Sequence, residues 1–189
     1  MMDISRLTRV FYNQFPVLEI EDLLLREVRP ESDANNYMAY LNHPEVAQFI
    51  PDNEVPTDIN RAFSDLKYWH GLFYQRYGLE WAITTAQQPD VIIGTVGISN
   101  LYHLRGELHY DVAQPYWGRG IATKAVRRVI EFAREEMGLL RIFASVATHN
   151  HASIHILEKH NFEPEGKMRA YNFLRGKPQD YYLYALIGK

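Results

Sequence analysis

The residues of this chain that most plainly indicate chemistry form a glycine-containing segment from Tyr116 to Thr123. The segment follows an apolar run that ends at Val112 and precedes a long pattern of helical period. Gly118 and Gly120, one residue apart, allow a turn in which several backbone N–H groups lie unpaired at the start of a helix. Because these donors and the helix dipole attract anions, the segment predicts a binding site for a phosphate or a diphosphate.

Two common phosphate-binding motifs do not fit the spacing of these glycines. A P-loop would end in Gly-Lys-Ser/Thr, whereas Lys124 is followed by Ala125. A dinucleotide fingerprint needs three glycines as Gly-x-Gly-x-x-Gly, and the segment has two. The segment instead resembles the coenzyme A pyrophosphate loop of the GNAT superfamily of N-acetyltransferases. Trp117 replaces the usual Arg or Gln, but Tyr-Trp-Gly-x-Gly-x-Ala is similar to the loop of the RimJ/RimL-like branch.

A second segment, from Asn150 to Phe162, resembles the signature Asn-x-x-Ser-x-x-x-Leu-Glu-Lys-x-Gly-Phe of the same superfamily. Asn161 stands in place of the glycine, a mild change because Asn also tolerates a left-handed helix end. The resemblance implies that Asn150 bonds to the cofactor arm between two splayed parallel strands. It also implies that Ser153 lies near the thioester sulfur and donates to the departing thiolate. Helix capping is the structural alternative for both residues.

The resemblance implies acetyl-CoA as cosubstrate, bound by the glycine loop, the strand before it and the helix after it. The cofactor-binding residues that it implies are Tyr110, Val112, Trp117, Gly118, Arg119, Gly120, Ile121, Ala122, Thr123, Asn150 and Lys159. An open backbone edge at a bulge in the strand over 107–112 would pair with the pantetheine amides as though the cofactor were a strand. Arg119 and Lys124 lie beside the loop, where they would neutralise phosphates.

Acetylation of an amine requires a neutral amine and a group that takes its proton. Strand alternation places Glu107, His109 and Asp111 on one face of the strand over 107–112. Glu107 aligns with the acidic residue that begins this strand in the superfamily and is the predicted general base, with Asp111 as the competing carboxylate. His109 replaces a usual glycine and is a third candidate, because imidazole titrates near neutrality. The alternative is that this face is merely solvated.

Composition excludes several classes of function. The formal net charge of −3 gives no electrostatic reason to expect nucleic-acid binding. The absence of cysteine excludes disulfides, thiolate catalysis and cysteine-based zinc sites. His151 and His155 lie four apart on one predicted helix, but no third ligand pattern accompanies them, so no metal is expected. With no signal peptide and no apolar run approaching ~18 residues, we expect a soluble cytoplasmic protein, either a monomer or a homodimer, that does not bind membranes.

The hydrophobic pattern predicts alternating strands and helices over a single domain spanning residues 1–189. The predicted strands are 18–28, 80–85, 91–98, 107–112, 142–147, 162–168 and 181–187. The predicted helices are 33–41 (capped by Ser32 or Asp33), a short turn over 44–50, 57–74 (capped by Thr57), 120–137 and 152–159. The order is mixed α/β. The resemblance implies the GNAT acyl-CoA N-acyltransferase fold, a mostly antiparallel sheet with a splayed parallel pair and flanking helices, with residues 1–15 as an extra N-terminal segment.

The function that this resemblance implies is transfer of an acetyl group from acetyl-CoA to a primary amine by direct attack, with no covalent acyl-enzyme. A protein α-amine, with a pKa of roughly 7.7–8.0, loses its proton at much lower cost than a lysine amine at about 10.4, so a weak base suits it. Two alternatives stay open. One is a small-molecule acceptor such as a polyamine or an aminoglycoside, and the other is a CoA-binding regulatory module without catalysis. The fold does not choose among them.

Overall fold

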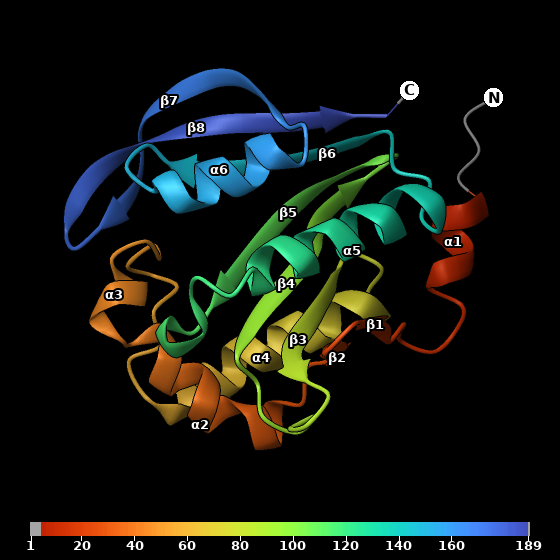
Figure 1. The fold of residues 1–189 in the computed structure, drawn as a ribbon, viewed down its shortest axis with the longest axis horizontal. Coiled ribbons are helices and arrows are strands. Elements are labelled where there is room, and N and C mark those ends of the chain that lie inside the picture. Colours follow the sequence, from red (N-terminus) through yellow and green to blue (C-terminus); the bar gives the residue numbers. More distant parts are fainter. Residues whose placement is uncertain (1–4, 189) are drawn as a thin grey trace.

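The computed structural model describes residues 5–188, which form an eight-stranded sheet flanked by helices (Figure 1). The strand order is β1-β2-β3-β4-β5-β6-β8-β7, and every neighbouring pair is antiparallel except β5 and β6. The strands are β1 (Leu18–Ile20), β2 (Leu23–Glu27), β3 (Leu79–Thr85), β4 (Gly94–Tyr102), β5 (Arg105–Val112), β6 (Arg141–Ala147), β7 (Glu163–Leu174) and β8 (Lys177–Ile187). The helices are α1 (Ser5–Val10), α2 (Pro30–Leu41), α3 (Pro44–Ala47), α4 (Ile59–Tyr74), α5 (Ile121–Glu135) and α6 (His151–Lys159), with a 3-10 turn at Gln114–Tyr116. The predicted mixed α/β fold with one parallel pair is confirmed.

Helices cover both faces of the sheet (Figure 1). Trp81 and Ala82 are neighbours on β3, and their side chains point to opposite faces. Trp81 belongs to the larger core cluster, which α5 completes with Val126 and Val129. Ala82 belongs to the second cluster, which residues of α2 and α4 such as Leu66 complete. The sheet is therefore buried on both sides in its centre.

The glycine loop leads directly into α5, the helix with the clearest amphipathic pattern. Its buried positions recur every three to four residues, as a helix packed on a sheet requires. These positions are Ile121, Ala125, Val126, Val129, Ile130, Phe132 and Ala133. Gly138 follows the helix at a φ of 71°, in the left-handed region that glycine adopts without strain. The prediction of a helix over 120–137 was therefore right to within two residues.

Some predicted boundaries were wrong. The single strand over 18–28 is in fact the hairpin of β1 and β2, because Glu21 adopts a left-handed φ of 50° and Ile20 pairs with Leu23. The helix predicted from Ser32 or Asp33 begins at Pro30, since proline has a suitable φ for the first helical position. Asp33 does not cap it but forms a buried ion pair with Arg26 at 2.7 Å. Elsewhere β4 starts and ends later than 91–98, and the last two strands form a longer hairpin than predicted.

The N-cap of α4 is Asp58, not the predicted Thr57, because the Asp58 carboxylate accepts a hydrogen bond from the Arg61 backbone N–H at 2.9 Å. We expect Asp58→Ala to lower the free energy of unfolding by about 1 kcal/mol. Thr57→Ala is the matched control and should leave it nearly unchanged. Denaturant unfolding of both variants measures this, and an equal or larger loss in Thr57→Ala would contradict the assignment.

Candidate active site

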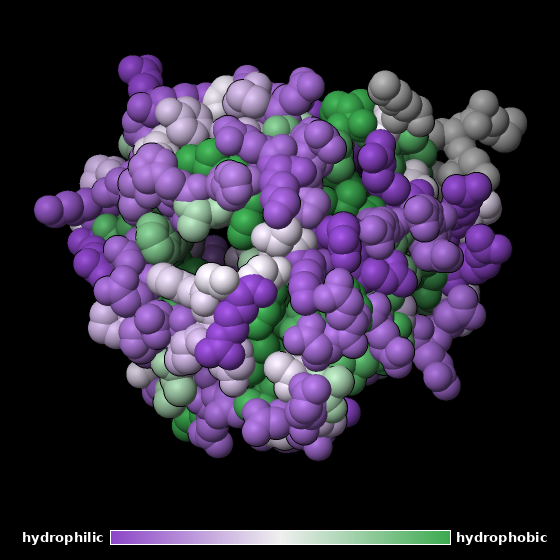
Figure 2. Space-filling view, in the orientation of Figure 1, coloured by the Kyte–Doolittle hydropathy of each residue, from purple (hydrophilic) through white to green (hydrophobic). Residues whose placement is uncertain are grey.

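The parallel strands β5 and β6 pair over three residues and then separate. Their pairing runs from Arg105 with Arg141 to Glu107 with Phe143. Beyond that point β5 stays paired with β4 as far as Val112, while β6 stays paired with β8. A cavity of about 880 Å³ extends from this fork to the glycine loop on one side and to α2, α3 and α4 on the other. Figure 2 shows the surface hollowed between α3, α6 and the glycine loop.

The separation leaves one backbone edge of β5 facing the cavity. Ala113 donates its backbone N–H to the Ile93 carbonyl oxygen at 2.8 Å, so odd-numbered residues direct their backbone groups to β4. By alternation, Leu108, Tyr110 and Val112 direct theirs into the fork. The predicted open edge thus exists, but it results from the fork rather than from a bulge in 107–112. The irregular pairing of β4 with β5 lies between Ser99 and Tyr102.

The glycine loop has the conformation that an anion-binding turn requires. Gly118 and Gly120 both have a φ of 73°, and a Cβ at either position would meet no protein atom within 4 Å. Gly120 caps α5, and the first bond into the helix runs from the Lys124 N–H to the Gly120 carbonyl oxygen at 2.9 Å. Residues Ile121 to Thr123 come before this first bond, so their N–H groups have no partner within the helix. All three residues line the cavity, at the positive end of the dipole of α5.

The basic residues predicted to meet phosphates lie outside the cavity wall. The Arg119 guanidinium stacks over the Tyr116 ring at 5.4 Å, and Lys159 is exposed at the end of α6. Their phosphate contacts stay predictions. Lys124 instead forms ion pairs with Glu21 at 2.6 Å and Asp22 at 3.3 Å, in the turn between β1 and β2. Trp117 lines the cavity and donates its indole N–H to the Val112 carbonyl oxygen at 2.6 Å.

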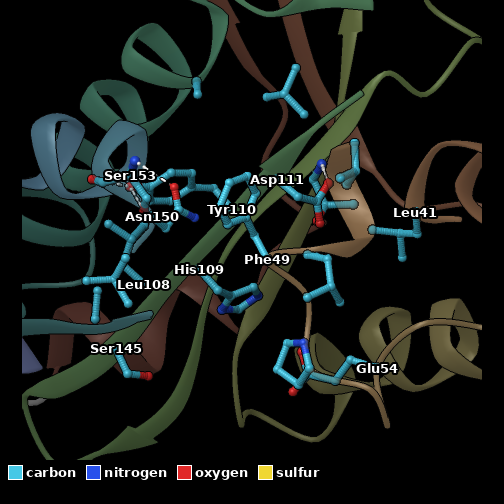
Figure 3. Close-up of a pocket in the computed structure, with 18 of the residues that line it drawn as sticks. Leu41, Phe49, Glu54, Leu108, His109, Tyr110, Asp111, Ser145, Asn150 and Ser153 are labelled. Atoms are coloured by element: carbon cyan, nitrogen blue, oxygen red, sulfur yellow. Dashed lines mark hydrogen bonds between the residues drawn. The ribbon is translucent and has the colours of Figure 1, made fainter. Parts of the chain in front are cut away.

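The second signature segment lies across the fork from the glycine loop. Asn150 caps α6, because its side-chain oxygen accepts the Ser153 backbone N–H at 3.1 Å. The Ser153 hydroxyl contacts the Tyr110 hydroxyl at 2.8 Å, a link between α6 and β5 (Figure 3). Burial raises the pKa of Tyr110 well above its usual value, so its hydroxyl stays protonated. The capping alternative for Asn150 is thus present, and its side chain also lines the cavity.

The predicted face of Glu107, His109 and Asp111 is not merely solvated, since all three residues line the cavity. Glu107 stands at the last paired position of the fork and accepts hydrogen bonds from Ser145 of β6 at 3.0 Å and Asn100 at 2.6 Å. Asp111 accepts from the backbone and hydroxyl of Thr95 at 3.0 and 3.1 Å. Burial raises the pKa of Asp111 to about 6.

Sequence reasoning missed Glu80, a carboxylate of β3 that is 1% exposed and hydrogen-bonds to His109. The two residues lie in one row across the sheet with Gly97 of β4 between them. A Cβ at Gly97 would collide with both side chains, so glycine is required for the pair to form. Burial opposes a charge on His109, but the Glu80 carboxylate outweighs it and raises the pKa of His109 to about 9. The ring, stacked on Trp69, is therefore protonated at neutral pH and unable to accept a proton there.

Comparison with known proteins assigns this arrangement to a family. The acetyltransferase (GNAT) domain model matches residues 22–163, well over half of the chain. The chain belongs to the GNAT family of acetyltransferases. The N-acetyltransferase YoaA of Bacillus subtilis, described as uncharacterized, is 30% identical over 92% of this chain and 97% of its own. The putative ribosomal N-acetyltransferase YdaF of the same organism is 32% identical over 85% and 81%.

Solved structures of the family have the same fold. A RimL structure, described as a ribosomal L7/L12 α-N-protein acetyltransferase in complex with coenzyme A, superposes with a TM-score of 0.81 at 16% identity, covering 91% of this chain and 98% of that one. The cavity at the fork therefore lies in the same fold as that RimL protein, whose structure contains coenzyme A. Among residues 5–188 no three His, Asp or Glu side chains gather as a metal site, and no helix is long and apolar enough to cross a membrane.

Proposed function

We propose that this GNAT enzyme transfers the acetyl group of acetyl-CoA to a primary amine by direct attack at the fork between β5 and β6. The observation that carries the proposal is the continuity of one cavity from the glycine loop, past the open edge of β5, to Glu107 and its neighbouring carboxylates. The loop suits the cofactor diphosphate because the space beside both glycines is free of protein atoms. Acetyl-CoA supplies the activated acyl group. The residues of the chain bind and orient the two substrates and take up the proton of the amine.

We assign each step of the proposed reaction to a residue that lines the cavity. In this proposal, backbone N–H groups on the open edge of β5 polarise the thioester carbonyl. The amine nitrogen forms a bond to the carbonyl carbon, and the carbon–sulfur bond breaks. Glu107 takes the proton of the amine, directly or through water. The Ser153 hydroxyl, paired with Tyr110, donates a hydrogen bond to the departing thiolate, which then takes up a proton from solvent.

The acceptor class that the relatives suggest first is a protein α-amine, because YdaF is described as a putative ribosomal N-acetyltransferase. A screen for acceptor-dependent release of free thiol from acetyl-CoA tests the proposed function. The panel contains N-terminal peptides, polyamines, aminoglycosides and simple alkylamines. We expect at least one class to release thiol well above the acceptor-free rate. Binding of acetyl-CoA without release for any amine would instead indicate a regulatory module.

The glycine loop gives a direct test of cofactor binding. We expect Gly120→Ala to weaken acetyl-CoA binding at least tenfold, about 1.4 kcal/mol, because the Cβ enters the space proposed for the diphosphate. The left-handed φ strains any alanine, so Gly138→Ala, at a φ of 71° away from the cavity, is the matched control. Calorimetry should show near wild-type affinity for Gly138→Ala. Equal affinities in the two folded variants would remove the loop from the cofactor site.

A further inference from the structure

The part of the cavity beyond the fork has more negative than positive charge. Its charged lining residues are Glu54, Arg61, Asp65, Glu80, Glu107, His109 and Asp111. The two cations are already paired, Arg61 with Asp65 at 2.7 Å and His109 with Glu80. The carboxylates of Glu107 and Asp111 accept hydrogen bonds only from uncharged groups within residues 5–188. Glu54 forms no ion pair within the same residues. Glu54, Glu107 and Asp111 therefore face the cavity without an ion pair in the described part of the chain, although the charge of His109 acts on all three from a distance.

Glu54 is held at the cavity by a contact between distant parts of the chain. It lies in the loop between α3 and α4, two residues after Asp52. The Asp52 carboxylate accepts the backbone N–H groups of Arg175 and Gly176, at 2.6 and 2.7 Å, in the turn between β7 and β8. The Asp52 N–H in turn donates to the Phe173 carbonyl oxygen at 3.0 Å. This contact fixes the loop of Glu54 beside the β7–β8 hairpin, so both segments line one end of the cavity.

The β8 side of the same end presents an unpaired polar atom. Tyr181 is 5% exposed and lines the cavity, and its hydroxyl is buried with no hydrogen-bond partner in the described part of the chain. A buried hydroxyl without a partner is costly, so this position calls for a bound polar group. Burial and, to a lesser extent, the nearby Glu54 carboxylate raise the pKa of Tyr181 to about 12, so the hydroxyl stays protonated and can donate or accept a hydrogen bond. The ring of Tyr171 lies against that of Tyr181 at 5.4 Å between ring centroids, and Phe49 also lines the cavity. Such rings suit methylene groups and a cation over a ring face.

We propose that the acceptor is an aliphatic diamine or polyamine whose second ammonium group binds between the Glu54 carboxylate and the Tyr181 hydroxyl. This inference rests on the proposed function, because the reacting amine of the same molecule lies at Glu107. A monoamine leaves Glu54 without a cation, whereas a second ammonium neutralises it and gives Tyr181 a hydrogen-bond partner. Figure 3 shows Glu54 and His109 on the same side of β5, and both residues line the same cavity as Glu107.

The test compares kcat/KM for α,ω-diamines of increasing length with kcat/KM for monoamines of the same length. The release of free thiol from acetyl-CoA is the readout. For the diamine of optimal length we expect at least a tenfold preference over its monoamine. Glu54→Gln should reduce this ratio toward one, and Tyr181→Phe, which keeps the ring, should reduce it in part. Glu45→Gln is the matched control, an exposed glutamate on α3 outside the cavity wall, and should keep the wild-type ratio.

Equal rates for diamine and monoamine, an unchanged ratio in Glu54→Gln, or a higher kcat/KM for an N-terminal peptide than for every diamine would overturn the inference. A failure of the proposed function is distinguishable from these results. If no amine releases thiol, calorimetry of the same diamines with the CoA-bound protein still tests whether the second ammonium group binds at Glu54. Diamine binding that Glu54→Gln weakens at least tenfold supports the subsite, and no binding overturns it.

Discussion

Glu107→Gln lowers the rate of acetyl transfer by roughly 10²–10⁴-fold at neutral pH, the loss expected for a general base. Glu107 stands where β5 and β6 separate, beside the open edge proposed for the acetyl group. Glutamine keeps the shape of the side chain. Its carbonyl oxygen can accept from Asn100 and its amide N–H can donate to the Ser145 hydroxyl oxygen, so the fork itself should persist. Part of the rate should return at higher pH, because the amine then loses its proton unaided.

The pH–rate profile separates Glu107 from its two neighbours. A base acts only when unprotonated, so the rate falls as the pH drops through its pKa. With Asp111 as the base that fall would lie near pH 6, and with His109 the rate would keep rising to about pH 9. Profiles of Glu107→Gln, Asp111→Asn and His109→Asn with the preferred acceptor measure this. Loss of the acid limb in Asp111→Asn, with wild-type rates in Glu107→Gln, would identify the other carboxylate.

Ser153→Ala lowers turnover on the order of tenfold to a hundredfold while acetyl-CoA affinity changes little. In the proposed mechanism the hydroxyl of Ser153 stabilises the departing thiolate, and the expected loss of turnover is modest because a thiol has a pKa near 8.5 and leaves readily. The Asn150 bond to the Ser153 backbone N–H does not need the side chain, so the start of α6 should stay intact. Steady-state kinetics together with calorimetry measure the two effects separately.

The contact between Tyr110 and Ser153 adds a further expectation. If the two hydroxyls act as one donor, Tyr110→Phe and the double variant should each lose about as much turnover as Ser153→Ala. Additive losses would mean that the hydroxyls act independently. A parallel fall in acetyl-CoA affinity with no turnover defect would make Ser153 a cofactor contact or a helix residue only.

Local patterns in the sequence predict much of this fold. The stripe of apolar residues in α5, with Gly120 before it and Gly138 after it, predicts both ends of that helix to within two residues. The glycine loop and the Asn150 to Phe162 segment are each a continuous run of residues, so a sequence motif can describe them. The structure places parts of both on one cavity. The β1–β2 turn was missed because Glu21 and Asp22 carry no glycine or proline to mark it.

Contacts between distant residues could not be predicted in this way. Glu80, Gly97 and His109 meet because β3, β4 and β5 are in register, and register depends on the whole sheet. The available signal was weak, namely one glutamate in the apolar run around Trp81. The Asp52 contact with the β7–β8 turn joins residues more than 120 positions apart, and no local pattern indicates it.

The central claim is direct transfer from acetyl-CoA to an amine, and mass spectrometry of a complete reaction tests it most directly. The enzyme is incubated with acetyl-CoA alone and then with its preferred amine, and free thiol, acetylated amine and intact enzyme are measured together. We predict one acetylated amine for each thiol released and an enzyme mass that stays unchanged before the amine is added. Thiol release without acetylated amine, or an acetylated enzyme that passes its acetyl group to the amine, would contradict the account.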